Sequence, residues 1–147
     1  MEHQSGYLKE EYFYLQRTVE SFDTRALTIK SWSVTVSMVG IGTAYLQSKP
    51  SLLLLSASSA LLFWIIETLW KSFQRAFTLR LEEIEILLEK TSIDNIASPR
   101  ISLSWKENLA KVRFWKIFFW PHVCLPHIII LLAGCLLFGL QEVSIGM

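Results

Sequence analysis

The sequence predicts an all-α integral membrane protein. We expect three transmembrane helices, the first two of which continue into a long antiparallel cytoplasmic helical hairpin. Hydrophobic residues make up 52% of the chain, with six Trp and nine Phe, a composition typical of a bilayer protein. Neither Gly nor Pro occurs from Ser51 to Lys90, so this stretch can form one helix that crosses the membrane and extends beyond it. Basic residues are also concentrated on one side of the predicted spans.

The segments expected to cross the bilayer are Ser31–Gln47, Ser51–Trp70 and Ile117–Leu140. The first is the least apolar, because Ser, Thr and Gly dilute it, and Trp32 and Tyr45 bracket it as interface anchors. The third contains no Asp, Glu, Lys or Arg. Pro121 and Pro126 interrupt it near its start, where we expect a kink.

Loop charge predicts the orientation of these spans. Thirteen Lys and Arg precede the first span or separate the second from the third, whereas the other two loops contain only Lys49. By the positive-inside rule, the protein is a multi-pass protein of the cell inner (plasma) membrane, with its N-terminus cytoplasmic and its C-terminus outside. The first residues lack the basic and apolar regions of a cleaved signal peptide.

The first 90 residues are expected to form a helical hairpin with one register. Apolar residues recur at steps of three and four on both sides of the first two spans, as in a coiled coil. Antiparallel pairing then places opposite each other residues whose numbers sum to about 96. The predicted stem interface consists of large apolar residues, namely Leu15, Val19, Phe22, Phe73, Phe77 and Leu81. In the bilayer, the residues predicted to pack the two helices together have small side chains, namely Ser33, Ser37, Gly40, Ala44 and Ser56.

This pattern divides the chain into two regions. Residues 1–90 are the helical hairpin, made of the cytoplasmic stem and transmembrane helices 1 and 2. Residues 91–147 contain a cytoplasmic linker, a short amphipathic helix at Trp105–Lys116 and the third transmembrane helix. The linker is the polar stretch Thr91–Ser104, which Pro99 interrupts.

A second small and polar stripe remains on the first span after the packing positions are assigned. Its residues are Ser31, Thr35 and Gly42. Polar groups in a bilayer need a partner, either water or another subunit. This surplus predicts a homo-oligomer and makes the three residues candidates for a pore lining.

Three ionisable residues are expected at membrane depth. Glu67 can pair with Lys71 one turn away, or with Lys30 across the hairpin, and we favour such a structural ion pair over a gate. His122 and His127 each follow a proline and form either a proton-sensitive pair or two interfacial imidazoles, one donating to a carbonyl that a proline frees. We favour the second interpretation, because the two side chains lie about 140° apart on an ideal helix.

Other function classes receive no support. The sequence has no phosphate-binding glycine loop, no CxxC motif and no recognisable Ser/His/Asp set, so we expect neither an enzyme nor a bound cofactor. The spacing of the two histidines is poor for a single metal ion. A net charge of +1 gives no case for nucleic acid. Cys124 and Cys135 lie too far apart on one predicted helix to form a disulfide with each other.

The order of elements from Glu11 to Lys90 resembles that of the SLATT-type small bacterial membrane effectors of conflict and defence systems. The resemblance is architectural: a cytosolic helix, two membrane helices and a helix that returns to the cytosol. The stretches FDTRALTIKSW and FWIIETLWKSFQ also look like motifs of small bacterial membrane proteins. The third span, with its two Pro-His pairs, departs from the SLATT pattern. The resemblance implies a pore-forming or membrane-perturbing effector switched by a cytosolic partner.

Two functions are therefore expected. The first is a homo-oligomeric pore or membrane-perturbing effector, in which the Ser/Thr stripe meets water. The alternative is a non-conducting scaffold or anchor whose stem docks a soluble protein in the cytoplasm. They differ in whether the surplus polar stripe contacts water or protein.

Overall fold

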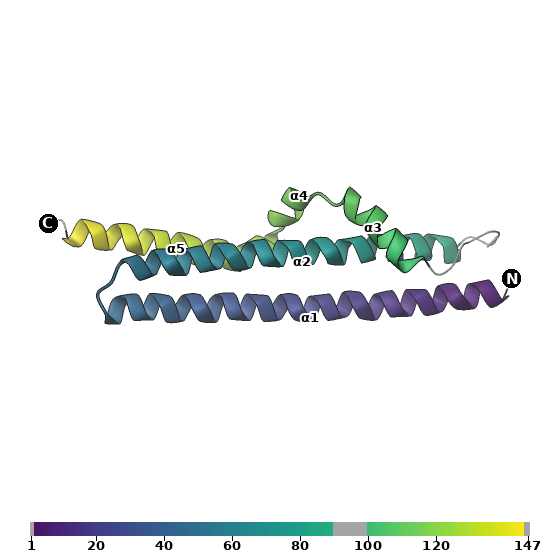
Figure 1. Ribbon diagram of the computed structural model, residues 1–147, viewed down its shortest axis with the longest axis horizontal. Helices are drawn as coiled ribbons and strands as arrows, with labels where there is room; N and C mark the ends of the chain where they lie inside the picture. Colours follow the sequence, from purple (N-terminus) through teal and green to yellow (C-terminus); the bar gives the residue numbers. More distant parts are fainter. Residues whose placement is uncertain (1, 90–99, 146–147) are drawn as a thin grey trace. The chain divides into compact units, whose positions relative to one another are not determined.

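The computed structural model describes residues 2–89 and 100–145, which form five helices and no strand (Figure 1). The helices are α1 (Glu2–Leu46), α2 (Ser51–Glu89), α3 (Ile101–Lys111), α4 (Phe114–Phe118) and α5 (Pro121–Ile145). The all-α prediction is therefore confirmed for the described part of the chain. As predicted, α2 begins at Ser51 and continues without interruption past the end of the apolar stretch.

The chain divides into two compact units. Unit 1 contains Met1–Arg25 and Trp70–Arg113, and unit 2 contains Ala26–Leu69 and Phe114–Met147. Each unit combines part of α1 with part of α2, whereas the sequence-based division at residue 90 separates consecutive stretches of chain.

A tight turn at the end of α1 reverses the chain within unit 2. Ser48 has a φ of 51°, the left-handed conformation that usually belongs to glycine at this position. The backbone N–H of Lys49 donates to Ala44 O (3.0 Å) and that of Ser48 to Tyr45 O (3.3 Å). This pair of bonds is a Schellman motif, which satisfies the last carbonyls of α1 and allows α2 to return antiparallel.

Unit 1 has a core formed by the predicted stem residues. Leu8, Leu15 and Ile84 are fully buried, and the side chains packed against them are Tyr12, Phe77, Leu81, Leu88 and Ile101. These residues include the pairs expected from a register sum of about 96, such as Leu15 with Leu81. Phe22 continues the same face and contacts the rings of Trp70 and Phe77. Burial of large apolar groups stabilises this unit in water.

Polar side chains reinforce the seam of unit 1. Arg80 is buried and donates from Nε to Glu11 Oε1 (3.0 Å) and from Nη1 to Glu83 Oε2 (3.2 Å). Burial opposes the charge of Arg80, but the hydrogen bonds and charges of Glu11 and Glu83 outweigh it, so that the pKa of Arg80 is raised. Elsewhere on the same seam, Lys71 binds Asp23, and the side chain of Gln74 donates to the backbone carbonyl of Val19.

Helix α3 covers the aromatic part of α2 in unit 1. The ring of Trp105 packs against Phe73 and Phe77, with 5.9 Å between centroids in both cases. The buried Asn108 donates to Ala76 O (3.4 Å). The predicted helix at Trp105–Lys116 is thus correct in kind, but its bounds are wrong: the helix begins at Ile101, and the extended backbone of Val112 ends it.

Two neighbouring segments also differ from their predicted bounds. Of the predicted polar linker Thr91–Ser104, residues 91–99 lie outside the described residues, and 101–104 are helical. The predicted third span at Ile117–Leu140 is divided between α4 and α5, because the chain leaves the helix after Phe118 and resumes at Pro121. Proline is well suited to the first position of a helix, where no N–H is required.

Unit 2 is held together by small residues. A Cβ built on Gly40 of α1 would lie 2.1 Å from Ser56 Oγ of α2, and one on Gly134 of α5 would lie 3.1 Å from Ala57 Cβ. The helices can approach this closely because these glycines have no side chain. One large residue supplements them: Trp64 stacks on Phe118 at 4.1 Å and donates from Nε1 to Phe118 O (2.9 Å).

Two helices of the described part are long and apolar enough to cross a membrane, α2 and the stretch Pro121–Gln141 of α5. The predicted first span at Ser31–Gln47 is not among them, so the expectation of three such helices is corrected to two. The reason is its composition, since Ser, Thr and Gly occupy so many of its positions.

Candidate functional site: a buried polar cluster in unit 2

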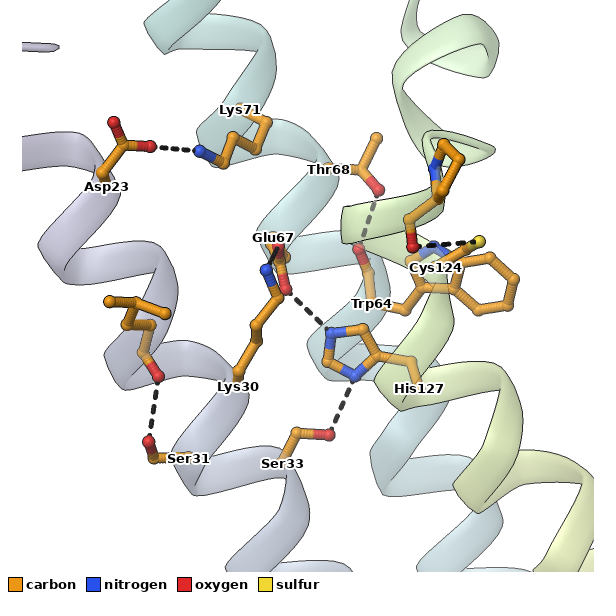
Figure 2. Close-up of polar contacts among 12 residues, drawn as sticks. Asp23, Lys30, Ser31, Ser33, Trp64, Glu67, Thr68, Lys71, Cys124 and His127 are labelled. Atoms are coloured by element: carbon orange, nitrogen blue, oxygen red, sulfur yellow. Dashed lines mark hydrogen bonds and ion pairs between the residues drawn. The ribbon is translucent and has the colours of Figure 1, made fainter.

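Glu67 of α2 is the centre of a buried polar cluster (Figure 2). Its side chain is fully buried, although carboxylates are rarely so unless they are paired. Two cationic or titratable groups from the neighbouring helices contact it. Lys30 of α1 places Nζ 2.8 Å from Glu67 Oε1, and His127 of α5 places Nε2 3.0 Å from Glu67 Oε2. The carboxylate therefore joins three helices of unit 2.

Ser33 completes the cluster on the far side of the imidazole. Its Oγ lies 2.9 Å from His127 Nδ1, and both side chains are fully buried. Ser33 follows Lys30 by three residues on α1, so both side chains face the same side of that helix. Figure 2 shows His127 between Ser33 and Glu67, with Lys30 reaching the carboxylate from α1.

The polar groups of the cluster face groups of suitable chemistry, although the buried Glu67 Oε1 has Lys30 as an ion-pair partner and accepts no hydrogen bond. An ammonium group only donates, an ionised carboxylate only accepts, and a neutral imidazole does one at each nitrogen. His127 therefore donates from Nε2 to Glu67 and accepts at Nδ1 from the Ser33 hydroxyl when its ring is neutral. Lys30 and Glu67 then cancel each other in charge, which reduces the cost of burying the carboxylate.

The serine, histidine and glutamate resemble the side chains of a hydrolytic triad, yet the geometry does not support acyl transfer. Ser33 has no exposed surface through which a substrate could reach its Oγ. It also lies within α1, where the backbone N–H groups bond inside the helix and are not free to form an oxyanion hole. The arrangement can instead hold charge and exchange protons.

The structure distinguishes between the alternatives for the three ionisable candidates. Glu67 pairs with Lys30 across the helices, whereas Lys71 binds Asp23 and Gln74 in unit 1. His122 and His127 do not form a pair. His122 is exposed and contacts the ring of Trp120, while His127 is buried in the cluster and does not bond a carbonyl freed by proline.

The two predicted stripes of α1 occupy different environments. Ser33, Ser37 and Ala44 are buried, and Gly40 contacts the buried Ser56. Ser37 Oγ also lies 3.3 Å from Ser59 Oγ, another pair whose numbers match the expected register. Ser31, Thr35 and Gly42 are exposed, and the hydroxyl of Ser31 turns to its own helix at Leu27 O (3.0 Å).

The predicted stem residues lie in unit 1, where Leu15 is fully buried. The others are partly buried, namely Val19, Phe22, Phe73, Phe77 and Leu81. Sequence reasoning missed the buried pair of Arg80 and Glu11 next to them. The two residues have opposite charge, but 80 and 11 sum to 91 rather than about 96, so the predicted register does not bring them together.

Sequence reasoning assigned Ser33 to helix packing alone and did not connect it with His127. The usable signal is that an acid on the second span and a histidine on the third both lie among apolar residues, where each needs a polar partner. No sequence pattern in α1 marks Ser33 rather than Ser37 as the third member.

No protein-family model matches the chain, and no curated protein or solved structure matches it. A function for this protein must therefore be inferred from its own residues.

Proposed function

We propose that the protein is a small homo-oligomeric inner-membrane protein that forms a pore or perturbs the membrane and is switched by a cytoplasmic partner or signal. The observation that carries this proposal is the division of α1 in unit 2 into two faces. One face, with Ser33 and Ser37, is buried, while the other exposes Ser31, Thr35 and Gly42. These exposed small and polar residues lie among apolar side chains such as Met38, and an oligomer with a hydrated interior would supply them with water.

The exposed apolar surface of unit 2 supports insertion into a bilayer. Leu55 and Leu62 of α2 expose 65% and 62% of their surface, and Leu132 and Leu136 of α5 expose 62% and 66%. Soluble monomers rarely expose so many large apolar side chains together. In lipid the same surface is favourable, and the small residues inside the unit suit helix packing there.

In this proposal the α1 segment Ser31–Gln47 also crosses the membrane, although its composition alone does not qualify it. Its polar groups would be shielded by α2 and α5 on one face and by water or a second subunit on the other. The loop charges then place the N-terminus in the cytoplasm and the C-terminus outside. The architectural resemblance to SLATT-type effectors supports the same function.

Cysteine reactivity in reconstituted membranes tests the proposal. Both native cysteines are first replaced, and a single cysteine is then placed at Ser31, Thr35 or Gly42. We expect a small aqueous thiol reagent to label these sites and to alter ion flow across the vesicle membrane. A cysteine at Ser37 is the matched control, because this position is buried, and it should remain unlabelled.

The alternative function is a non-conducting scaffold or anchor whose stem docks a soluble protein. One feature of unit 1 favours it: Phe13 and Tyr14 expose 58% and 59% of their surface. Tyr14 also lines a hollow of about 440 Å³, together with Phe77 and Trp105. If the α1 cysteines were unreactive in every state and a soluble protein bound to unit 1, the scaffold would replace the pore.

A further inference from the structure

We propose that unit 2 contains a proton-binding site, in which His127 takes up one proton at Nδ1 and replaces Lys30 as the counter-ion of Glu67. The ligand is the hydrogen ion itself. This inference goes beyond the proposed function and does not depend on whether the protein conducts ions.

The hydrogen-bond geometry around the imidazole of His127 accommodates a second ring proton. Because an ionised carboxylate accepts only, the Nε2 atom of His127 must be the donor to Glu67 in either protonation state. The Ser33 hydroxyl can donate or accept, so it bonds a neutral Nδ1 as a donor and a protonated Nδ1 as an acceptor. A proton can therefore bind the Nδ1 lone pair while the hydroxyl rotates, and the heavy atoms of His127 and Ser33 can stay in place.

Protonation of His127 changes the net charge of the cluster. With a neutral ring, Lys30 and Glu67 balance each other, whereas a protonated ring leaves the buried cluster with one excess positive charge. The charged groups that face His127 are Glu67 from α2 and, through the same carboxylate, Lys30 from α1. Lys116 of α4 is exposed, and α5 has no Asp, Glu, Lys or Arg from 121 to 141. The cluster must therefore lose its excess charge through its own members.

Lys30 and the protonated His127 are buried to different extents. The side chains of Glu67 and His127 have no exposed surface, whereas that of Lys30 is 22% exposed. Lys30 also has a long flexible stem that can carry its ammonium group to a wetter environment. Once His127 is protonated, the release of Lys30 restores a neutral ion pair in the buried site at the lowest cost. Proton uptake is thus coupled to the loss of the contact between α1 and Glu67.

Solid-state NMR of the full chain in lipid bilayers tests this exchange. The protein carries ¹⁵N in His and Lys and ¹³C in Glu, and spectra are recorded from about pH 8 to about pH 5, the range in which histidine usually titrates. At the upper end we expect His127 to carry a proton on Nε2 alone and Lys30 Nζ to lie near the Glu67 carboxyl carbon. On acidification the ring should gain a second proton, and the Lys30–Glu67 contact should disappear over the same pH range.

Two variants separate the cluster from the other histidine of α5. His122→Gln, on the exposed side of α5, should leave both transitions unchanged. His127→Gln should keep the Lys30–Glu67 contact at every pH. The wild-type titration needs no variant, so it remains decisive if His127→Gln fails to fold. The proposal is overturned if the His127 ring stays singly protonated throughout, or if it gains a proton while Lys30 keeps its contact. Loss of that contact in His127→Gln would equally overturn it.

Discussion

Gly40 sets the distance between α1 and α2 in unit 2. Replacement by alanine would bring a Cβ to 2.1 Å from Ser56 Oγ and 3.3 Å from Ser56 Cβ. The hydroxyl can rotate away, but the second contact is tight and the hydroxyl then loses its bond to Leu52 O. We expect Gly40→Ala to destabilise unit 2 by about 1–3 kcal/mol, measured by unfolding in detergent.

Gly42 is the matched control for Gly40, because a Cβ at this position meets nothing within 4 Å. Gly42→Ala should be neutral or stabilising by up to about 1 kcal/mol, since alanine favours the helix. Removal of the clashing hydroxyl in the double variant Gly40→Ala, Ser56→Ala should recover part of the loss. A larger effect at Gly42 than at Gly40 would contradict the close approach.

Tyr12 provides a pH-dependent contact in unit 1. Its hydroxyl donates to Glu85 Oε1 (2.9 Å), and this hydrogen bond, with the negative charge of Glu85, raises the pKa of Tyr12 above its ordinary value of about 10. A raised pKa in the folded state contributes stability below pH 10, which is lost as the pH rises through the raised pKa. Glu85→Gln should lower the Tyr12 pKa, as measured by NMR of ¹³C-labelled tyrosine, whereas Glu82→Gln should not.

The sequence allows part of the buried cluster to be predicted. The hairpin register brings Lys30 close to Glu67, because their numbers sum to nearly the expected value, and the ion pair follows. His127 lies on α5, and its position depends on how that helix is rotated and how far it is shifted along α2. These quantities depend on side-chain packing, such as Trp64 against Phe118 and Gly134 against Ala57, which a periodicity argument does not contain.

At the scale of elements, the α1–α2 turn contains a residue in an unfavourable conformation. The left-handed backbone costs a serine roughly 1 kcal/mol relative to glycine. Ser48→Gly should therefore stabilise unit 2 by about that amount in thermal unfolding. Ser58→Gly is the control, since Ser58 is an exposed residue inside α2, where glycine destabilises a helix by about 0.5–1 kcal/mol. Destabilisation by both changes would argue against the Schellman turn.

The α1–α2 seam of unit 1 supplies a second test at this scale. Leu15 is fully buried and its neighbour Gln16 is exposed. Leu15→Asp should cost about 3 kcal/mol or more, because it buries a charge, while Gln16→Asp should change stability by about 0.5 kcal/mol or less. In a background without native cysteines, Leu15→Cys should form a disulfide with Leu81→Cys. Equal trapping with Gln16→Cys would show that the register is wrong.

The long helices were easier to predict than the short ones. α2 follows from the absence of Gly and Pro and from a sustained apolar period. The bounds of α3 and α4 depend on tertiary contacts instead: Trp105 and Asn108 fix α3 against the carbonyls of Phe73 and Ala76. Ile101 packs into the core of unit 1, which favours an earlier helix start than the polar sequence around it indicates.

At the scale of the whole molecule, the proposed topology can be tested by labelling intact cells. This topology is proposed because thirteen of the fourteen Lys and Arg lie on one side of the predicted spans. In a background without native cysteines, Glu10→Cys and Ser102→Cys should be protected from an impermeant thiol reagent, while Ser48→Cys and Val143→Cys should react. These four positions are all exposed in the structure. Labelling of Ser102→Cys and Val143→Cys from the same side would end the three-span proposal.

The buried positions of α1 limit how the length of this chain can change in evolution. The apolar and small ones among them, Leu8, Leu15, Ala26, Ser33, Ser37 and Ala44, follow one another at intervals of seven, eleven, seven, four and seven residues, and the buried Glu11 lies between the first two. Each interval is close to a whole number of helical turns. An inserted codon early in α1 would turn every later side chain by about 100° and bring Arg25 and Trp32 to the positions of Ala26 and Ser33. Natural length variants should therefore differ by about seven or eleven residues, with a compensating change in α2.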